Sequence, residues 1–270
     1  MSALCGRQGG SLPAGWAEGG RDFIHSWLSQ HCPEYAESRV LEGDVAEGQP
    51  FLLNLVYFLL KEMGDADYAV FNSFKTGVTL GILQPMPRTP AVFEEQVKWK
   101  RGFDPFADPS LFAANYKSLG EHLGAVEEQF RLEQEEGMRL EMDWEDFVAR
   151  FGTNYAISAL AVLQEGEKLR VLHDGSNTTM VNHRIRPRDK VRMPGFRELQ
   201  FLLRMFQAER RIPVSVVGDV SKAHRRVKID PLEQGYQSCQ LRPGKVWVNR
   251  LHLWDGAHLV LVEPFVGRFA

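Results

Sequence analysis

Cysteines and long apolar runs are both scarce in this sequence, and each scarcity narrows the classes of protein to which it can belong. Its 270 residues contain three cysteines, Cys5, Cys32 and Cys239, which lie far apart and form no C-x-x-C pair. A disulfide framework or a zinc site draws on paired or closely spaced cysteines, so the sequence favours neither. A reducing, intracellular setting is the simplest expectation.

The sequence also lacks the roughly 18 to 20 consecutive apolar residues that a membrane-spanning helix needs. The nearest candidate, Phe51–Leu60, is short, contains Asn54 and is followed by two charged residues, so it predicts a buried helix. No basic region followed by an apolar stretch opens the sequence, which argues against a secretory signal. We therefore expect no contact with a membrane.

Charge is unevenly distributed along the chain. Residues 1–165 hold 13 Lys/Arg against 25 Asp/Glu, whereas residues 166–230 hold 15 against 7, a net charge of +8. A basic block within an acidic protein is typical of a surface that meets phosphate groups. The alternative is that its arginines pair with the acidic half of the chain.

The first half of the sequence predicts helices and one irregular region. Residues 1–20 are Gly-rich and predict disorder, helices are expected over 21–31 and 51–63, and residues 65–90 favour strands or extended loops. The clearest predicted helix begins at the cap Asp108-Pro109 and ends near Gly137. Its apolar stripe comprises Phe112, Tyr116, Leu119, Leu123, Val126 and Phe130. Its acidic residues, expected to form a solvated face, are Glu121, Glu127, Glu128, Glu133, Glu135 and Glu136.

The second half predicts a hairpin, a helix and a buried strand. Residues 157–163 and 168–173 favour two strands joined by a tight turn, with Lys168 and Arg170 near its tip. Residues 195–210 predict an amphipathic helix, and the Val-rich run 212–217 predicts a buried strand followed by Asp219 and a short helix over 221–227.

Two of these segments, in this order, resemble motifs of reverse transcriptases. Residues 159–174, ALAVLQEGEKLRVLHD, are similar to the fingers hairpin of that family, in which a polar turn precedes basic residues, an apolar pair and an aspartate. Residues 219–229, DVSKAHRRVKI, are similar to its first catalytic motif, which opens with an aspartate at a strand end. The other positions that match are Glu136-Gly137-Met138, Asn182 and Pro194.

The resemblance implies an α+β fold built as the partial fingers and palm of a right-hand polymerase over residues 106–251. Residues 21–105 then form an additional helical N-terminal region of unknown role, after a disordered start at 1–20, and residues 252–270 form a divergent tail. The implied reaction is RNA-directed DNA synthesis, a template-directed nucleotidyl transfer by two divalent ions.

The resemblance also implies roles for particular residues. Asp219 would ligate Mg²⁺ (or Mn²⁺) as the catalytic carboxylate, with the carbonyl of Val220 beside it. Lys168 and Arg170 would reach the triphosphate of the incoming nucleotide, and His224 would lie beneath its sugar. The basic residues that would follow the backbone of an RNA template or RNA/DNA hybrid are Arg184, Arg186, Arg188, Lys190 and Arg192.

Simpler interpretations stand beside these roles. Asp219 could cap the short helix that follows it, His224 could be a buried histidine, and the basic residues could be solvated. Three departures from the family matter: Ser176 replaces a basic residue in a longer loop, His224 replaces an aromatic, and no paired aspartates follow Asp219. We therefore expect a truncated, catalytically inactive chain.

Two further hypotheses come from other classes of protein. A non-enzymatic nucleic-acid-binding protein would use the basic segment 168–228 without chemistry. An interaction module would use its acidic helix to bind a basic partner.

Overall fold

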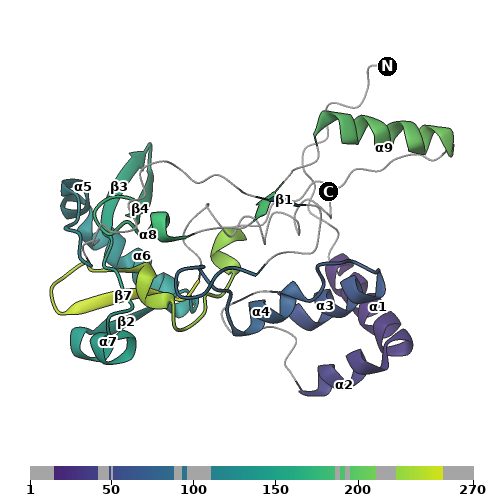
Figure 1. Cartoon of the computed structure of the whole chain (residues 1–270), viewed down its shortest axis with the longest axis horizontal. Helices are drawn as coiled ribbons and strands as arrows, with labels where there is room; N and C mark the ends of the chain where they lie inside the picture. The colour runs from purple at the N-terminus through teal and green to yellow at the C-terminus, as the bar shows by residue number, and fades with distance from the viewer. Residues whose placement is uncertain are drawn as a thin grey trace.

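The structure, a computed structural model, describes residues 15–41, 49, 51–87, 93–95, 111–185, 189–191, 195–210 and 223–251. Helices and small antiparallel sheets alternate along the chain, so the predicted α+β class is confirmed (Figure 1). Within these ranges no helix is both long and apolar enough to cross a membrane.

The helices of the described residues are α1 (Trp16–His31), α2 (Pro33–Leu41), α3 (Leu53–Glu62), α4 (Val70–Thr76), α5 (Lys117–Glu121), α6 (Leu123–Glu135), α7 (Trp144–Phe151), α8 (Val181–Arg184) and α9 (Phe196–Ala208), with the 3-10 turns η1 (Ala223–Arg226) and η2 (Gln234–Gln237). The strands are β1 (Phe93–Glu95), β2 (Arg139–Asp143), β3 (Ala159–Glu165), β4 (Lys168–Asp174), β5 (Asp189–Val191), β6 (Ser238–Cys239) and β7 (Lys245–Asn249). They form the antiparallel sheets β2-β7-β6, β3-β4 and β1-β5.

Strand β7 is buried on both of its faces because a helix covers each of them. Trp247 packs edge-to-face on Phe130 of α6, with the ring centroids 5.4 Å apart. Val246 and Val248 point the other way, since side chains alternate along a strand, and join Phe147 of α7 in a second cluster. The small sheet is thus the middle layer between α6 and α7.

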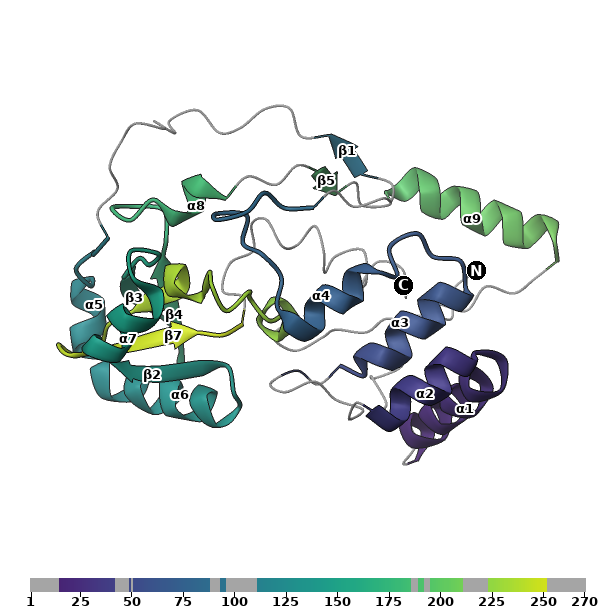
Figure 2. The same cartoon turned by 60° about the horizontal axis from the view of Figure 1, so that its bottom comes forward.

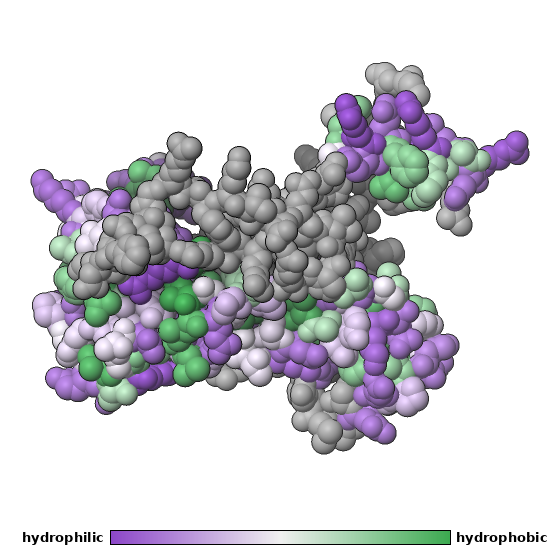
Figure 3. Space-filling model, viewed as in Figure 1, coloured by the Kyte–Doolittle hydropathy of each residue, from purple (hydrophilic) through white to green (hydrophobic). Residues whose placement is uncertain are grey.

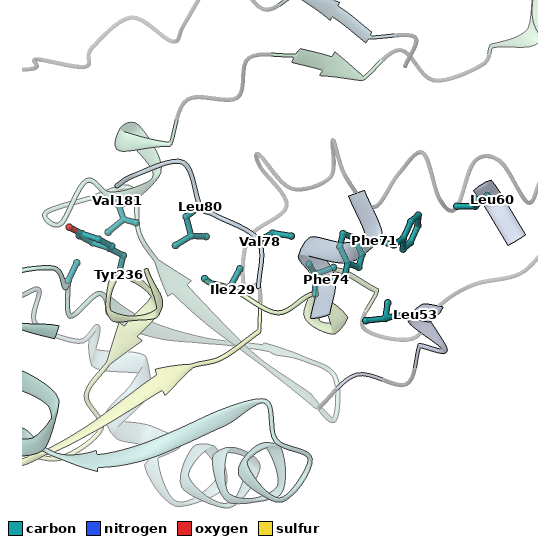
Figure 4. Close-up of a cluster of buried hydrophobic side chains, with 11 residues drawn as sticks. Leu53, Leu60, Phe71, Phe74, Val78, Leu80, Val181, Ile229 and Tyr236 are labelled. Carbon is teal, nitrogen blue, oxygen red and sulfur yellow. The ribbon is translucent and has the colours of Figure 1, made fainter. Parts of the chain in front are cut away.

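A third hydrophobic cluster joins the N-terminal region to the rest of the protein. Phe71 and Phe74 of α4 and the buried Leu80 lie in one cluster with Ile229 and Tyr236 (Figure 4). Its other members are Leu53, Leu60, Val78, Ala156, Val181 and Val227. Residues 51–82 therefore share a core with residues more than 70 positions later in the sequence.

Several predicted elements are confirmed with small changes in their ends. Helix α3 occupies the span expected at 51–63, and α9 occupies the amphipathic helix expected at 195–210. None of the side chains of α9 is buried, and Figure 3 shows apolar side chains on the surface of this protruding helix. Of the short helix expected over 221–227, residues 223–226 form the 3-10 turn η1.

Three predictions are corrected by the structure. Disorder over 1–20 is wrong for residues 16–20, which belong to α1. The exclusion of helix from 65–90 is wrong because α4 lies there, stabilised by the burial of Phe71 and Phe74. The acidic face is not wholly solvated, since Glu133 is buried.

The long helix predicted from Asp108 begins only at Lys117 and is interrupted at His122. Residues 112–116 instead lie along β3 and the chain just before it, where the amide N–H groups of Ala113 and Tyr116 donate to the carbonyls of Ile157 and Leu160. Pairing with β3 uses the backbone groups that a helix would need. Asp108-Pro109, the strand predicted at 212–217 and the tail 252–270 lie outside the described residues.

Candidate nucleic-acid interface

The β3-β4 hairpin presents one apolar and one exposed face. Val162 and Val171, which are opposite each other in the register, face inward and pack with Leu119 and Val126. Lys168 and Arg170 alternate with the inward residues of β4 and lie on the exposed face. The predicted hairpin, with both basic side chains near its tip, is confirmed.

Arg170 makes a surface ion pair. Its Nε lies 2.8 Å from Oε2 of Glu165, and both side chains are about half exposed, at 55% and 44%. Exposed pairs of this kind contribute little to stability and are screened by salt. The guanidinium is therefore accessible to an external anion, and Lys168, directly after the turn, is exposed as well.

The base of the same hairpin carries a compact polar cluster around Asp174. The carboxylate accepts hydrogen bonds from the Tyr116 hydroxyl at 2.6 Å, the Asn177 side chain at 2.7 Å, and the backbone N–H groups of Ser176 and Asn177 at 3.0 and 3.1 Å. Burial raises the pKa of Asp174, but these hydrogen bonds outweigh it and lower the pKa to about 2. The cluster fixes how the chain leaves β4.

The loop between Asp174 and Asn182 is held by hydrogen bonds at its ends. Asn182 donates from its backbone N–H to the Gly175 carbonyl and from its side chain to Ser176 Oγ. Thr178 and Met180 adopt left-handed backbone angles, with φ of 53° and 52°, which side-chain-bearing residues rarely adopt. A loop with hydrogen-bonded ends thus joins Asp174 to Asn182.

Behind the hairpin, a buried ion cluster links α6, β2 and η1. Glu133 accepts hydrogen bonds from Arg225 at 2.5 and 2.9 Å, and also from Arg139 and Gln129. Burial raises the pKa of Glu133, but the Arg225 hydrogen bonds and the charges of both arginines lower it to about 2. The guanidinium of Arg139 stacks on the Phe130 ring, 3.6 Å from its centroid.

His173 faces this cluster from the inner side of β4. Its Nε2 lies 3.2 Å from the Ser238 carbonyl oxygen. Burial, followed by the charge of Arg139, lowers the pKa of His173 to about 3. The histidine is therefore neutral at physiological pH.

Of the predicted basic run, Arg184 and Lys190 are described. Arg184 lies in α8, with its guanidinium 5.7 Å from the Tyr236 ring centroid. Lys190 lies in β5, directly opposite Glu94 of β1 in the register. Pro194 and the remaining basic residues of the run, Arg186, Arg188 and Arg192, lie outside the described residues.

The predicted catalytic centre is described only at its margin. Asp219 and Val220 lie outside the described residues, and His224 is placed by its backbone in η1. Among the described residues no group of three His, Cys, Asp or Glu could hold a metal ion. Glu233 follows Asp219 in the sequence. Its carboxylate accepts hydrogen bonds from Thr79 Oγ1 at 2.8 Å and from the N–H groups of Ile82 and Leu83 at 3.0 and 2.6 Å. The hydrogen-bonding capacity of this carboxylate is therefore already used within the fold.

Sequence reasoning did not identify the buried roles of Glu133 and Glu233. For Glu133 a signal exists, because it follows Phe130 by three positions and so continues the apolar stripe of α6. For Glu233 no local pattern exists, since its partners lie about 150 residues earlier.

Comparison of the sequence with protein-family models and with curated proteins finds no match.

Proposed function

We propose that the chain is a reverse-transcriptase-like protein that binds nucleic acid, either an RNA template or an RNA/DNA hybrid. The observation that carries the proposal is the hairpin, which holds Lys168 and Arg170 on an exposed face while its inner face packs on α5 and α6. A guanidinium suits phosphate oxygens bidentately, and a rigid support lowers the entropic cost of binding.

The basic run that begins at α8 would supply further phosphate contacts in this proposal. Arg184 is held next to Tyr236, and Lys190 belongs to strand β5. Alternate residues of an extended segment lie on one side, which suits contacts to successive phosphates. In this proposal, Asp219, Val220 and His224 would receive the nucleotide, and Mg²⁺ would supply Lewis-acid chemistry if Asp219 binds it.

A second candidate function is nucleic-acid binding without chemistry. The saturated carboxylate of Glu233 favours it, because this acidic residue shortly after Asp219 serves the fold instead of a metal. Asp230 likewise accepts the backbone N–H of Leu232 at 2.9 Å. The two candidates share the same phosphate-binding surface and differ in whether a primer is extended.

Binding is tested by fluorescence anisotropy of a labelled RNA/DNA hybrid from ~50 to ~200 mM salt. The Lys168→Ala/Arg170→Ala variant should bind more weakly to every sequence, and its log–log salt slope should be shallower by about 2 than that of the wild type. The matched control is Arg131→Ala/Lys245→Ala, which removes the same charge from the side chains beside Trp247. Equal losses in both variants would show a general charge effect and contradict the assignment to the hairpin.

A further inference from the structure

Strand β2 is the outermost strand of the sheet β2-β7-β6 (Figure 2). Where its ladder with β7 ends, the N–H of Trp144 donates to the Gly244 carbonyl at 3.0 Å. Hydrogen-bonded pairs recur at every second residue of an antiparallel ladder, so Met142 and Leu140 are the residues of β2 that bond to β7. The exposed Glu141 therefore directs its backbone N–H and carbonyl to the opposite side of the strand. Within the part of the chain that the structure describes, no strand pairs with this outer edge.

The outer edge of β2 is apolar on one face of the sheet and acidic on the other. Leu140 and Met142 lie opposite Val248 and Val246 in the register, so they share the face that α7 covers, and both are only partly buried. Glu141 lies on the other face, towards α6. A strand added here would thus meet apolar side chains on one face and a carboxylate on the other.

A hollow of about 600 Å³ borders the acidic face, between α6 and the sheet. Its cationic residues each form an ion pair with an acidic neighbour, namely Arg131 with Glu128, Lys245 with Asp143 and Arg242 with Glu127. Two acidic residues that line the same hollow, Glu135 and Glu141, are exposed and form no ion pair with any residue that the structure describes. Their carboxylates are therefore available to a cation from outside.

We propose that the outer edge of β2 binds an extended segment of a partner protein in which basic and apolar residues alternate. The segment adds to the sheet as one more antiparallel strand, with its basic side chains next to Glu141 and Glu135 and its apolar side chains next to Leu140 and Met142. A second copy of β2 is the poorer occupant, because edge-to-edge pairing sets the Glu141 carboxylates of the two copies against each other. The inference goes beyond nucleic-acid binding and does not depend on it.

The alternation of the segment fixes which of its backbone groups meet the protein. Directly opposed residues of an antiparallel pair lie on the same face of the sheet, so the residue opposite Glu141 is a basic one. Because Glu141 directs its own N–H and carbonyl outward, this basic residue exchanges both hydrogen bonds with it. The N–H groups of the basic residues therefore point to β2, and those of the apolar residues point away.

The test uses a labelled eight-residue peptide in which Lys and Val alternate. Its binding to the full chain is measured by fluorescence anisotropy at ~50 mM salt, where charges are weakly screened. N-methylation of the lysines should weaken binding by about tenfold or more, because it removes the donors that face β2. N-methylation of the valines should change binding by less than about twofold, because these N–H groups face water.

A second arm changes the protein and keeps the peptide. Glu135→Gln/Glu141→Gln removes the two available carboxylates and should weaken binding by about fivefold. Glu62→Gln/Glu121→Gln is the matched control, since it removes the same charge from exposed positions on α3 and α5. The control should bind within about twofold of the wild type.

The proposal is supported by a loss confined to the methylated lysines together with a loss confined to Glu135→Gln/Glu141→Gln. Equal effects of the two methylated peptides, or a loss with the valine series alone, overturn strand addition in this register. Equal binding by the two protein variants overturns the role of the carboxylates, and absence of binding at millimolar peptide overturns the whole proposal. A wild-type dimer in light scattering that the peptide dissociates would assign the edge to a second copy and overturn the partner.

Discussion

Glu133 in α6 and Arg225 in η1, which are 92 positions apart in the sequence, form a bidentate ion pair beneath the β3-β4 hairpin. Arg139 donates to the same carboxylate and is itself buried against Phe130. One carboxylate thus holds two guanidinium groups in the interior. The pair ties η1, which contains the backbone of His224, to the helix that supports the hairpin.

Replacing Glu133 with Gln should destabilise the protein by about 3 to 5 kcal/mol, because the buried Arg139 and the partly buried Arg225 then lose their counter-ion. Urea denaturation measures the change. Glu127→Gln is the matched control, since it breaks a bidentate pair with Arg242 at an exposed site on the same helix. The control should leave the midpoint nearly unchanged, and equal midpoints for both variants would contradict the buried role of Glu133.

Stability should begin to fall below pH 6.5 because of His173. Its pKa of about 3 in the folded protein lies below the unfolded value of 6.5, so the unfolded chain binds the proton first. The stabilisation is complete above pH 6.5 and is lost as the pH falls towards 3. Between pH 6.5 and 4.5, where Glu133 and Asp174 stay charged, the loss should reach about 2 kcal/mol.

The control for this pH dependence is His173→Gln. A glutamine can still donate to the Ser238 carbonyl but cannot titrate, so the free energy of unfolding should become flat over pH 4.5 to 6.5. Thermal or urea unfolding across that range measures it. A slope that persists in the variant would assign the proton to another group.

Gly77→Ala should destabilise the protein by at least about 2 kcal/mol, because the backbone has a φ of 120° and the new methyl group would meet the Ile229 backbone. Gly120→Ala is its counterpart in α5, where nothing lies within 4 Å and alanine favours the helix by roughly 0.5 to 1 kcal/mol. Denaturation midpoints should therefore move in opposite directions. A shift of Gly77→Ala in the direction of Gly120→Ala would refute the close approach.

The polypeptide of residues 1–270 by itself should not extend a primer. Two-metal transfer needs carboxylates on both sides of the ion pair, and both described acidic residues after Asp219 accept backbone hydrogen bonds. A primed RNA template with dNTPs and Mg²⁺ or Mn²⁺ provides the assay. Extension that Asp219→Asn abolishes would contradict this prediction and favour the enzymatic candidate.

Elements whose pattern is local could be predicted from the sequence. The hairpin follows from two β-rich runs around a Gly-containing turn, and α3 and α9 follow from apolar periodicity. Each of these signals lies within about a dozen residues, which is the range that periodicity can report.

Features that depend on distant partners could not be predicted. The pairing of β1 with β5 leaves no side-chain pattern in a three-residue strand, since main-chain hydrogen bonds carry it. Residues 112–116 have a helical pattern, but β3 supplies their hydrogen-bond partners. The burial of Glu133 depends on Arg225, which belongs to another element. The hairpin of the candidate site could thus be predicted from the sequence, whereas the distant elements that hold it in place could not.

The partnership of Leu80 and Glu233 has a consequence for biosynthesis. These residues are 153 positions apart, so the amide groups of loop 79–83 leave the ribosome long before the carboxylate that will bind them. At translation rates of roughly 5 to 20 residues per second, the delay is about 8 to 30 s. During that interval the nascent chain carries a vacant anion-binding loop that follows the apolar segments of α3 and α4 in the sequence.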